Sequence, residues 1–108
     1  MAVDNIQDAH PSHVTGSWTS TACCATAQTE TIGFTPELVI VIIDSGGTNP
    51  NILVKHNSET DEGLLITGST GVITSPADAA NVSISGNTFV VAAAAQTASG
   101  TNQYIAFR

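Results

Sequence analysis

The segment Leu38–Ile43 is the clearest feature of the hydrophobic pattern, because six large aliphatic residues follow one another between Glu37 and Asp44. Val and Ile dominate the segment, and their branched Cβ atoms favour an extended strand over a helix. A half-buried strand would alternate apolar and polar positions, so the uninterrupted run predicts a strand that is buried on both faces. Pro36 before the run and the loop 45–50 after it mark the ends of the predicted strand.

Shorter apolar or alternating segments, separated by turn residues, predict the remaining strands. They lie at 13–20, 21–32, 52–56, 64–67, 72–74, 81–85, 88–95 and 103–108. Pro76–Ala80 is predicted as one helical turn with Ser75 as its cap. Strands spaced about 8–12 residues apart predict an all-β fold, an antiparallel β-sandwich that is jelly-roll-like and has about eight short strands.

The chain has 108 residues, which suits a single domain with its own core. Residues 13–108 are predicted to form one β-sandwich domain. Residues 1–12 contain acids, His10 and Pro11 and show little periodicity, so we expect a flexible N-terminal arm that becomes ordered on binding.

The charge composition limits the partners that the chain can bind. Only 10% of the residues are charged, the formal net charge is −7, and Lys55 and Arg108 are the only basic residues. Two isolated cations cannot neutralise a phosphate backbone, so we expect no binding to nucleic acid and none to anionic membranes. A membrane-spanning helix, which needs about 20 apolar residues, and a secretory signal are not expected either.

Candidate chemical groups are few. Cys23 and Cys24 are adjacent and are predicted to be reduced thiols, with an intermolecular disulfide or a metal as the alternatives. His10 and His13 could share a metal on a helix, but Pro11 and the strand context favour solvated histidines. The acidic segment 59–62 lacks the spacing of an EF-hand loop and is interpreted as a hairpin tip. We therefore expect no catalytic residue, no cofactor, no metal and no enzymatic activity.

The large aromatic residues are candidates for either the core or an interface. They are Trp18, Phe34, Phe89, Tyr104 and Phe107. The core is the favoured interpretation for each, although aromatic side chains also anchor interfaces. The predicted partner-binding residues are Val3, Ile6, His10, His13 and Trp18.

Two segments resemble a known group of proteins. Residues 31–42, TIGFTPELVIVI, resemble the GF-x-P-x-hydrophobic run of small β-sandwich proteins in tailed-bacteriophage virions. Residues 99–107, SGTNQYIAF, are similar to the closing segment of the same group. Both motifs are structural, and together they cover about a fifth of the chain.

The resemblance implies a structural virion protein and carries over no catalytic residue. We expect a capsid decoration (cement) protein that assembles in the host cytoplasm, binds the major capsid protein on the outside of the head and forms a homotrimer. It would stabilise the particle by binding only the intact lattice. The alternative is a tail-tip or fibre module that binds a host glycan or receptor near His56 or Trp18.

Overall fold

The computed structural model describes residues 12–20, 26–58, 62–78, 82–96 and 100–108, which contain nine β-strands and one short 3-10 helix. The strands are β1 (His13–Thr19), β2 (Gln28–Thr31), β3 (Leu38–Ile43), β4 (Asn51–His56), β5 (Glu62–Ile66), β6 (Ile73–Asp78), β7 (Val82–Ser85), β8 (Thr88–Val91) and β9 (Thr101–Phe107). The 3-10 helix is η1 (Ala93–Ala95).

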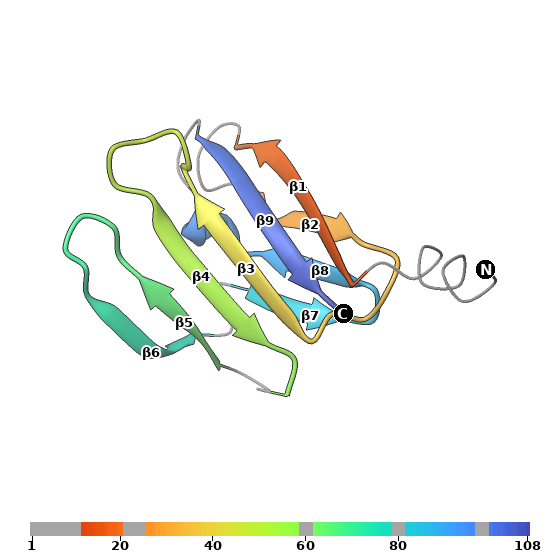
Figure 1. Cartoon of the computed structure of the whole chain (residues 1–108). Coiled ribbons are helices and arrows are strands. Elements are labelled where there is room, and N and C mark those ends of the chain that lie inside the picture. Colours follow the sequence, from red (N-terminus) through yellow and green to blue (C-terminus); the bar gives the residue numbers. More distant parts are fainter. Residues whose placement is uncertain (1–11, 21–25, 59–61, 79–81, 97–99) are drawn as a thin grey trace.

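The strands form two antiparallel sheets, which confirms the predicted all-β sandwich. The larger sheet has six strands in the order β1-β9-β3-β4-β5-β6, and the smaller has three in the order β2-β8-β7. Figure 1 shows the small sheet behind β1, β9, β3 and β4, whereas β5 and β6 extend beyond it. One face of the large sheet is therefore covered by the small sheet, and no other described element covers the opposite face.

The central strand β3 is buried on one face only, so the prediction of burial on both faces is wrong. Val39, Val41 and Ile43 point towards the small sheet and are fully buried. Leu38, Ile40 and Ile42 point the other way and are only half-buried. The small sheet consists of three four-residue strands and provides a second layer on one side alone.

Three aromatic side chains join the two sheets in the core. The Phe89 ring of β8 meets the Tyr104 ring of β9 edge-on, with 4.9 Å between the ring centroids. The Trp18 ring of β1 lies 6.4 Å from that of Tyr104. The favoured interpretation of these three residues as core residues is therefore confirmed, while Phe34 and Phe107 are half-buried.

Two local predictions are wrong. Residues 93–95 form η1 instead of continuing a strand, since Ala has a high helix propensity and the Gln96 N–H donates to the Ala93 carbonyl. Residues 76–78 belong to β6 instead of a helical turn. Proline is compatible with β6 because β6 is an edge strand of the large sheet. Residues 79 and 80 lie outside the described residues.

Gly16 allows β1 and β9 to pack around a large ring. It lies directly opposite Tyr104 in the β1–β9 pair, and a Cβ at position 16 would come 2.5 Å from the tyrosine ring. The ring therefore occupies the space that a side chain at position 16 would need. An aromatic residue that covers a cross-strand glycine also helps to fix the register of the pair.

We predict that Gly16→Ala lowers the free energy of unfolding by about 1–3 kcal/mol, because the added methyl group overpacks the Tyr104 ring. Urea unfolding followed by the fluorescence of Trp18, the only tryptophan, measures the change. Gly46→Ala is the matched control, since a Cβ at position 46 meets nothing within 4 Å. Equal stability of the two variants would contradict the packing argument.

Candidate functional site

The uncovered face of the six-stranded sheet, here called the outer face, carries a continuous set of apolar side chains. Strand register assigns to it Leu38, Ile40, Ile42, Ile52, Val54, Leu64, Ile66, Ile73, Ile105 and Phe107. Most of them are half-buried, and Ile73 is 61% exposed. An apolar patch of this extent on a monomer marks a site of interaction more often than a plain surface.

The apolar residues of the outer face are arranged in rows across the strands. One row runs through Ile105, Ile40, Val54 and Leu64 on β9, β3, β4 and β5. The next row runs through Ile42, Ile52, Ile66 and Ile73 on β3 to β6. Directly opposed residues in a sheet have Cβ atoms about 5 Å apart, so each row is in contact from end to end.

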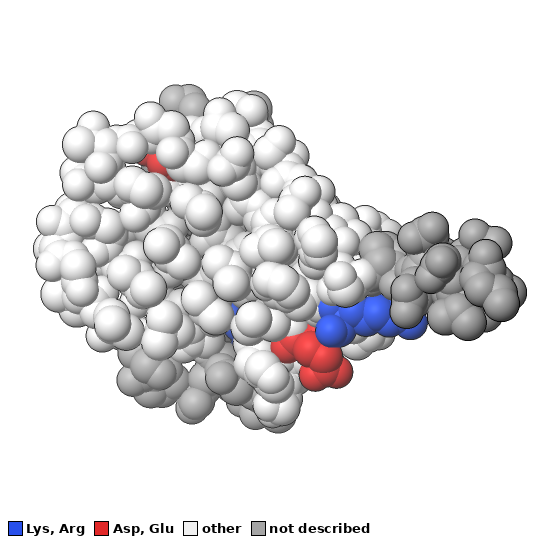
Figure 2. Space-filling model, viewed as in Figure 1, with Lys and Arg blue, Asp and Glu red and all other residues white. Residues whose placement is uncertain are grey.

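The outer face is also almost without charge. None of its positions in β1, β9, β3 and β4 is Asp, Glu, Lys or Arg. Figure 2 shows this side of the molecule as a broad uncharged surface whose largest group of charged atoms lies at its lower right margin. In a chain with a net charge of −7, such a face suits a partner surface that is itself neutral and apolar.

A shallow open groove of about 440 Å³ lies on the outer face next to β1. Its floor is aliphatic, from Ile40, Ile42 and Ile105, and its polar wall comes from Thr15, Ser17 and Gln103. The titratable residue in the lining is Tyr104, whose ring packs on the core side of the sheet. The groove can therefore accept an apolar side chain, and its lining offers no pair of nucleophile and base.

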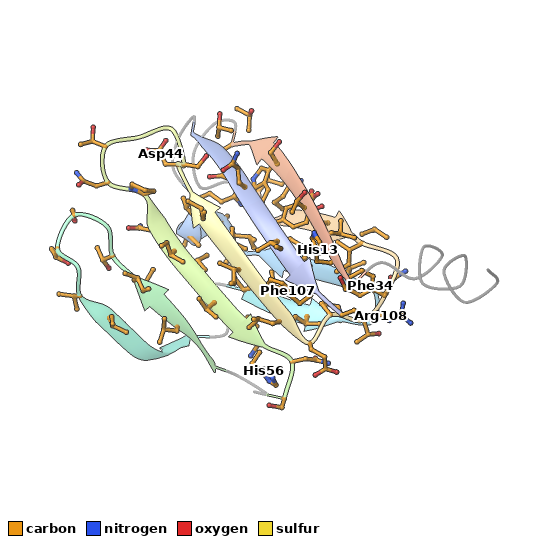
Figure 3. The ribbon with its side chains drawn as sticks, in the orientation of Figure 1. His13, Phe34, Asp44, His56, Phe107 and Arg108 are labelled. Atoms are coloured by element: carbon orange, nitrogen blue, oxygen red, sulfur yellow. The ribbon has the colours of Figure 1, made fainter. Side chains whose placement is uncertain are left out.

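One end of the outer face is bordered by two histidines. His13, Phe107, Leu38 and His56 form a row across β1, β9, β3 and β4, with the exposed histidines at its two ends (Figure 3). The His13 and Phe107 rings lie 6.3 Å apart. The candidate partner residue His13 therefore lies on the surface, at the edge of the outer face.

The same end of the sheet holds the C-terminus. The Arg108 guanidinium lies 5.9 Å from the centre of the Phe34 ring, a cation–π geometry, and its backbone N–H donates to the Ser12 carbonyl. Figure 3 shows Arg108 and Phe34 side by side at the margin of the outer face. Arg108 is thus held to one side of the apolar rows.

Trp18, in contrast, is directed into the core and is only 9% exposed. Its indole N–H donates to Gln96 Oε1 at 3.0 Å, and the Ser20 hydroxyl donates to the same oxygen at 3.2 Å. Asn102 Nδ2 donates to Ser20 Oγ at 2.7 Å. Because this buried network uses the polar atom of Trp18, the residue has little surface left for a partner or a glycan.

The other candidate partner residues, Val3, Ile6 and His10, lie outside the described residues, as do Cys23 and Cys24. Within the described ranges no group of three or more His, Cys, Asp or Glu side chains could hold a metal ion. The same part of the chain contains no helix that is long and apolar enough to cross a membrane.

Sequence reasoning did not single out the residues of the outer face. The signal was present, since Leu38–Ile43 has twice as many large aliphatic residues as one buried face of a strand requires. The structure places five of the other strands in the same sheet as β3, which leaves three short strands to cover it. The run predicts a strand buried on both faces, but its surplus apolar residues form part of the outer face instead.

Comparison of the chain with models of protein families, with curated proteins and with solved structures gives no match.

Tyr104 is linked to Glu30 of β2 across the core. Burial is the main cause that raises the pKa of the Tyr104 phenol above 10.0, and the charge of Glu30 and a hydrogen bond to it raise the pKa further. The protonated phenol therefore stabilises the fold at pH values below 10.0, and this stabilisation is lost as the pH rises through the raised pKa.

We predict that Glu30→Gln lowers the pKa of Tyr104 but leaves it above 10.0, since the desolvation remains while the negative charge is removed. Tyr104 is the only tyrosine, so tyrosinate absorbance during an alkaline titration reports it alone. Glu37→Gln, at an exposed acid before β3, should leave the pKa unchanged. An identical pKa in wild type and Glu30→Gln would exclude the contact.

We also predict that Asn102→Ala lowers the free energy of unfolding by about 1–3 kcal/mol, because the Asp44 N–H and the Ser20 hydroxyl lose their hydrogen-bond partner. Asn102 is fully buried, and its Oδ1 accepts a hydrogen bond from the Asp44 N–H at 2.9 Å. Gln103→Ala changes the exposed neighbour and should have little effect. Chemical denaturation of the two variants tests the difference, and similar midpoints would argue against the network.

Proposed function

We propose that the chain is a non-enzymatic structural protein of a tailed-bacteriophage particle, a decoration protein that binds the outer surface of the capsid through its outer face. The observation that carries the proposal is the apolar face of the six-stranded sheet, which no other described element covers and which has no Asp, Glu, Lys or Arg on β1, β9, β3 and β4. Such a surface is the expected centre of a protein–protein interface, where charged residues are depleted. The resemblance of residues 31–42 and 99–107 to small virion proteins supports the choice of partner.

The proposed contact extends from the apolar rows to the start of the domain. His13 lies at the edge of the outer face, so the N-terminal arm predicted at residues 1–12, with Val3, Ile6 and His10, joins the domain beside this surface. Arm and sheet together would bind neighbouring capsid subunits. Because the chain would bind the assembled shell and not free subunits, its binding would stabilise the shell by mass action.

The alternative, a tail-tip or fibre module that binds a host glycan, has less support. Glycan sites commonly stack a sugar ring on an exposed aromatic side chain, but Trp18 is buried, the floor of the groove is aliphatic, and His56 is not part of the groove lining. The outer face provides shape and apolar area more than directed hydrogen bonds. These properties favour a protein surface as the ligand.

We predict that Ile40→Lys weakens binding to capsids that lack the chain by at least about a hundredfold, because a lysine would be buried without a partner in the interface. Co-sedimentation of purified protein with such capsids measures the affinity. Thr29→Lys adds the same charge at an exposed position of the small sheet and should bind like the wild type.

The position in the particle provides a second readout. A decoration protein is present in many copies on the head, whereas a tail-tip module is present in a few, and quantitative mass spectrometry of purified virions separates the two. A low copy number, or full capsid binding by Ile40→Lys, would contradict the proposal.

A further inference from the structure

Strand β1 lies at an edge of the six-stranded sheet, and no described residue pairs with the side of its backbone that faces away from β9. It pairs with β9 on one side and is the terminal strand of the sheet (Figure 1). Its seven residues, HVTGSWT, contain no proline and no Asp, Glu, Lys or Arg. Proteins usually protect an edge of this kind with charges, proline, bulges or short length, because it can pair with another strand.

The other three edge strands have such protection. β6 contains Pro76, ends at Asp78 and has an irregular register with β5. β2 and β7 are only four residues long. Among the described edges, β1 is therefore the one that is suited to pair with a further strand.

The hydrogen bonds at the two ends of β1 show which backbone groups face the open side. The Arg108 N–H donates to the Ser12 carbonyl, and the Ser20 N–H donates to the Gly100 carbonyl. In the continuous register of β1 with β9, the even-numbered residues are thus the hydrogen-bonded pairs. The N–H and C=O groups of His13, Thr15, Ser17 and Thr19 consequently point away from β9.

We propose that β1 is the site at which a second copy of this chain pairs, antiparallel, about a twofold axis near Gly16. This register places Thr15 of each copy opposite Ser17 of the other, and His13 opposite Thr19. All four outward-facing residues take part, and each opposed pair can exchange two backbone hydrogen bonds. The contact is isologous, the commonest kind among homo-oligomers, so it gives a dimer and differs from the homotrimer expected from the family resemblance.

The continuous register of β1 and its lack of Asp, Glu, Lys and Arg favour a second copy as the occupant. Two chains with a net charge of −7 repel each other across most of their surfaces, and like charges opposite one another in a sheet are destabilising. β1 contains no Asp, Glu, Lys or Arg, and its His13 lies opposite Thr19 in this register, so two copies can pair there without like charges facing each other. A basic peptide, in contrast, would find no acidic side chain on this strand to select it.

The pairing does not depend on the proposed capsid role, but it would extend the surface that this role uses. It joins the two six-stranded sheets edge to edge, so the outer faces of both copies become one continuous face. Edge pairing alone makes a small interface, and small interfaces are weak. The dimer is therefore expected at high concentration, or where copies are held side by side on a lattice.

Sedimentation equilibrium from about 10 μM to about 1 mM tests the proposal, a range that detects micromolar to millimolar dissociation constants. The mass of the wild type should rise towards that of a dimer. Thr15→Pro removes an N–H that faces the open edge and leaves the bonds to β9 intact, so this variant should remain monomeric. In Thr29→Pro the lost N–H likewise points away from β8, and this control should dimerise like the wild type.

A second pair of variants retains the backbone N–H and so remains informative if proline prevents folding. Thr15→Lys is the test variant, and Thr29→Lys is its control. A lysine at the edge opposes strand pairing through its charge. Trp18 fluorescence during unfolding shows that each variant is folded. A wild type that stays monomeric at every concentration, or a dimeric Thr15→Lys, would overturn the proposal.

Amide hydrogen exchange identifies the strand that pairs. Protection of the Thr15, Ser17 and Thr19 amides should appear as the protein concentration rises, whereas the β9-bonded Gly16 and Trp18 amides should be protected throughout. A dimer in which these three amides still exchange freely would place the contact elsewhere. Protection that is already complete in the monomer would mean that another segment of the chain occupies the edge. Either outcome would refute the assignment.

Discussion

The structure depends on unequal burial of the two faces of β3. Val39, Val41 and Ile43 are sealed against the small sheet, and their apolar area supplies the centre of the core. The opposite face has side chains of the same chemistry, but the described residues form no second layer there, because the three short strands of the small sheet lie on one side only. One aliphatic segment thus supplies both the hydrophobic stabilisation of the fold and an apolar surface for association. The inward side chains fix the sheet in place, and the outward side chains form its exposed face.

Much of the architecture was predictable from local patterns. The aliphatic run 38–43, the proline before it and the regular turns indicate strands, and their spacing indicates two antiparallel sheets. The sequence does not show which strands belong to which sheet. The pairing of β1 with β9, for example, joins residues that are far apart in the chain, and local patterns carry no information about such contacts. That division decides which face remains uncovered. The same long-range contacts direct Trp18 inward, towards Gln96, while His13 on the same strand faces outward.

The predictions for two short segments were wrong, because each segment is compatible with both an extended and a helical backbone. Residues 93–95 were expected to continue the preceding strand, but they form a helical turn, in agreement with the high helix propensity of alanine. This turn brings Gln96 to the buried indole N–H of Trp18. Pro76 suggested a helical turn, but an edge strand accepts proline equally well. Both errors concern short segments of three residues, 93–95 after β8 and 76–78 in the second half of β6.

The close fit of Gly16 and Tyr104 has a consequence for natural variation. The tyrosine ring fills the volume that a side chain at position 16 would occupy, so the two positions behave as a single steric unit. Descendants that keep an aromatic residue at position 104 are confined to glycine at position 16. Descendants with a smaller residue at position 104 can accept a side chain at position 16, and a side chain that fills the space left by the tyrosine ring would stabilise the fold. Substitutions at these two sites should therefore co-vary during evolution.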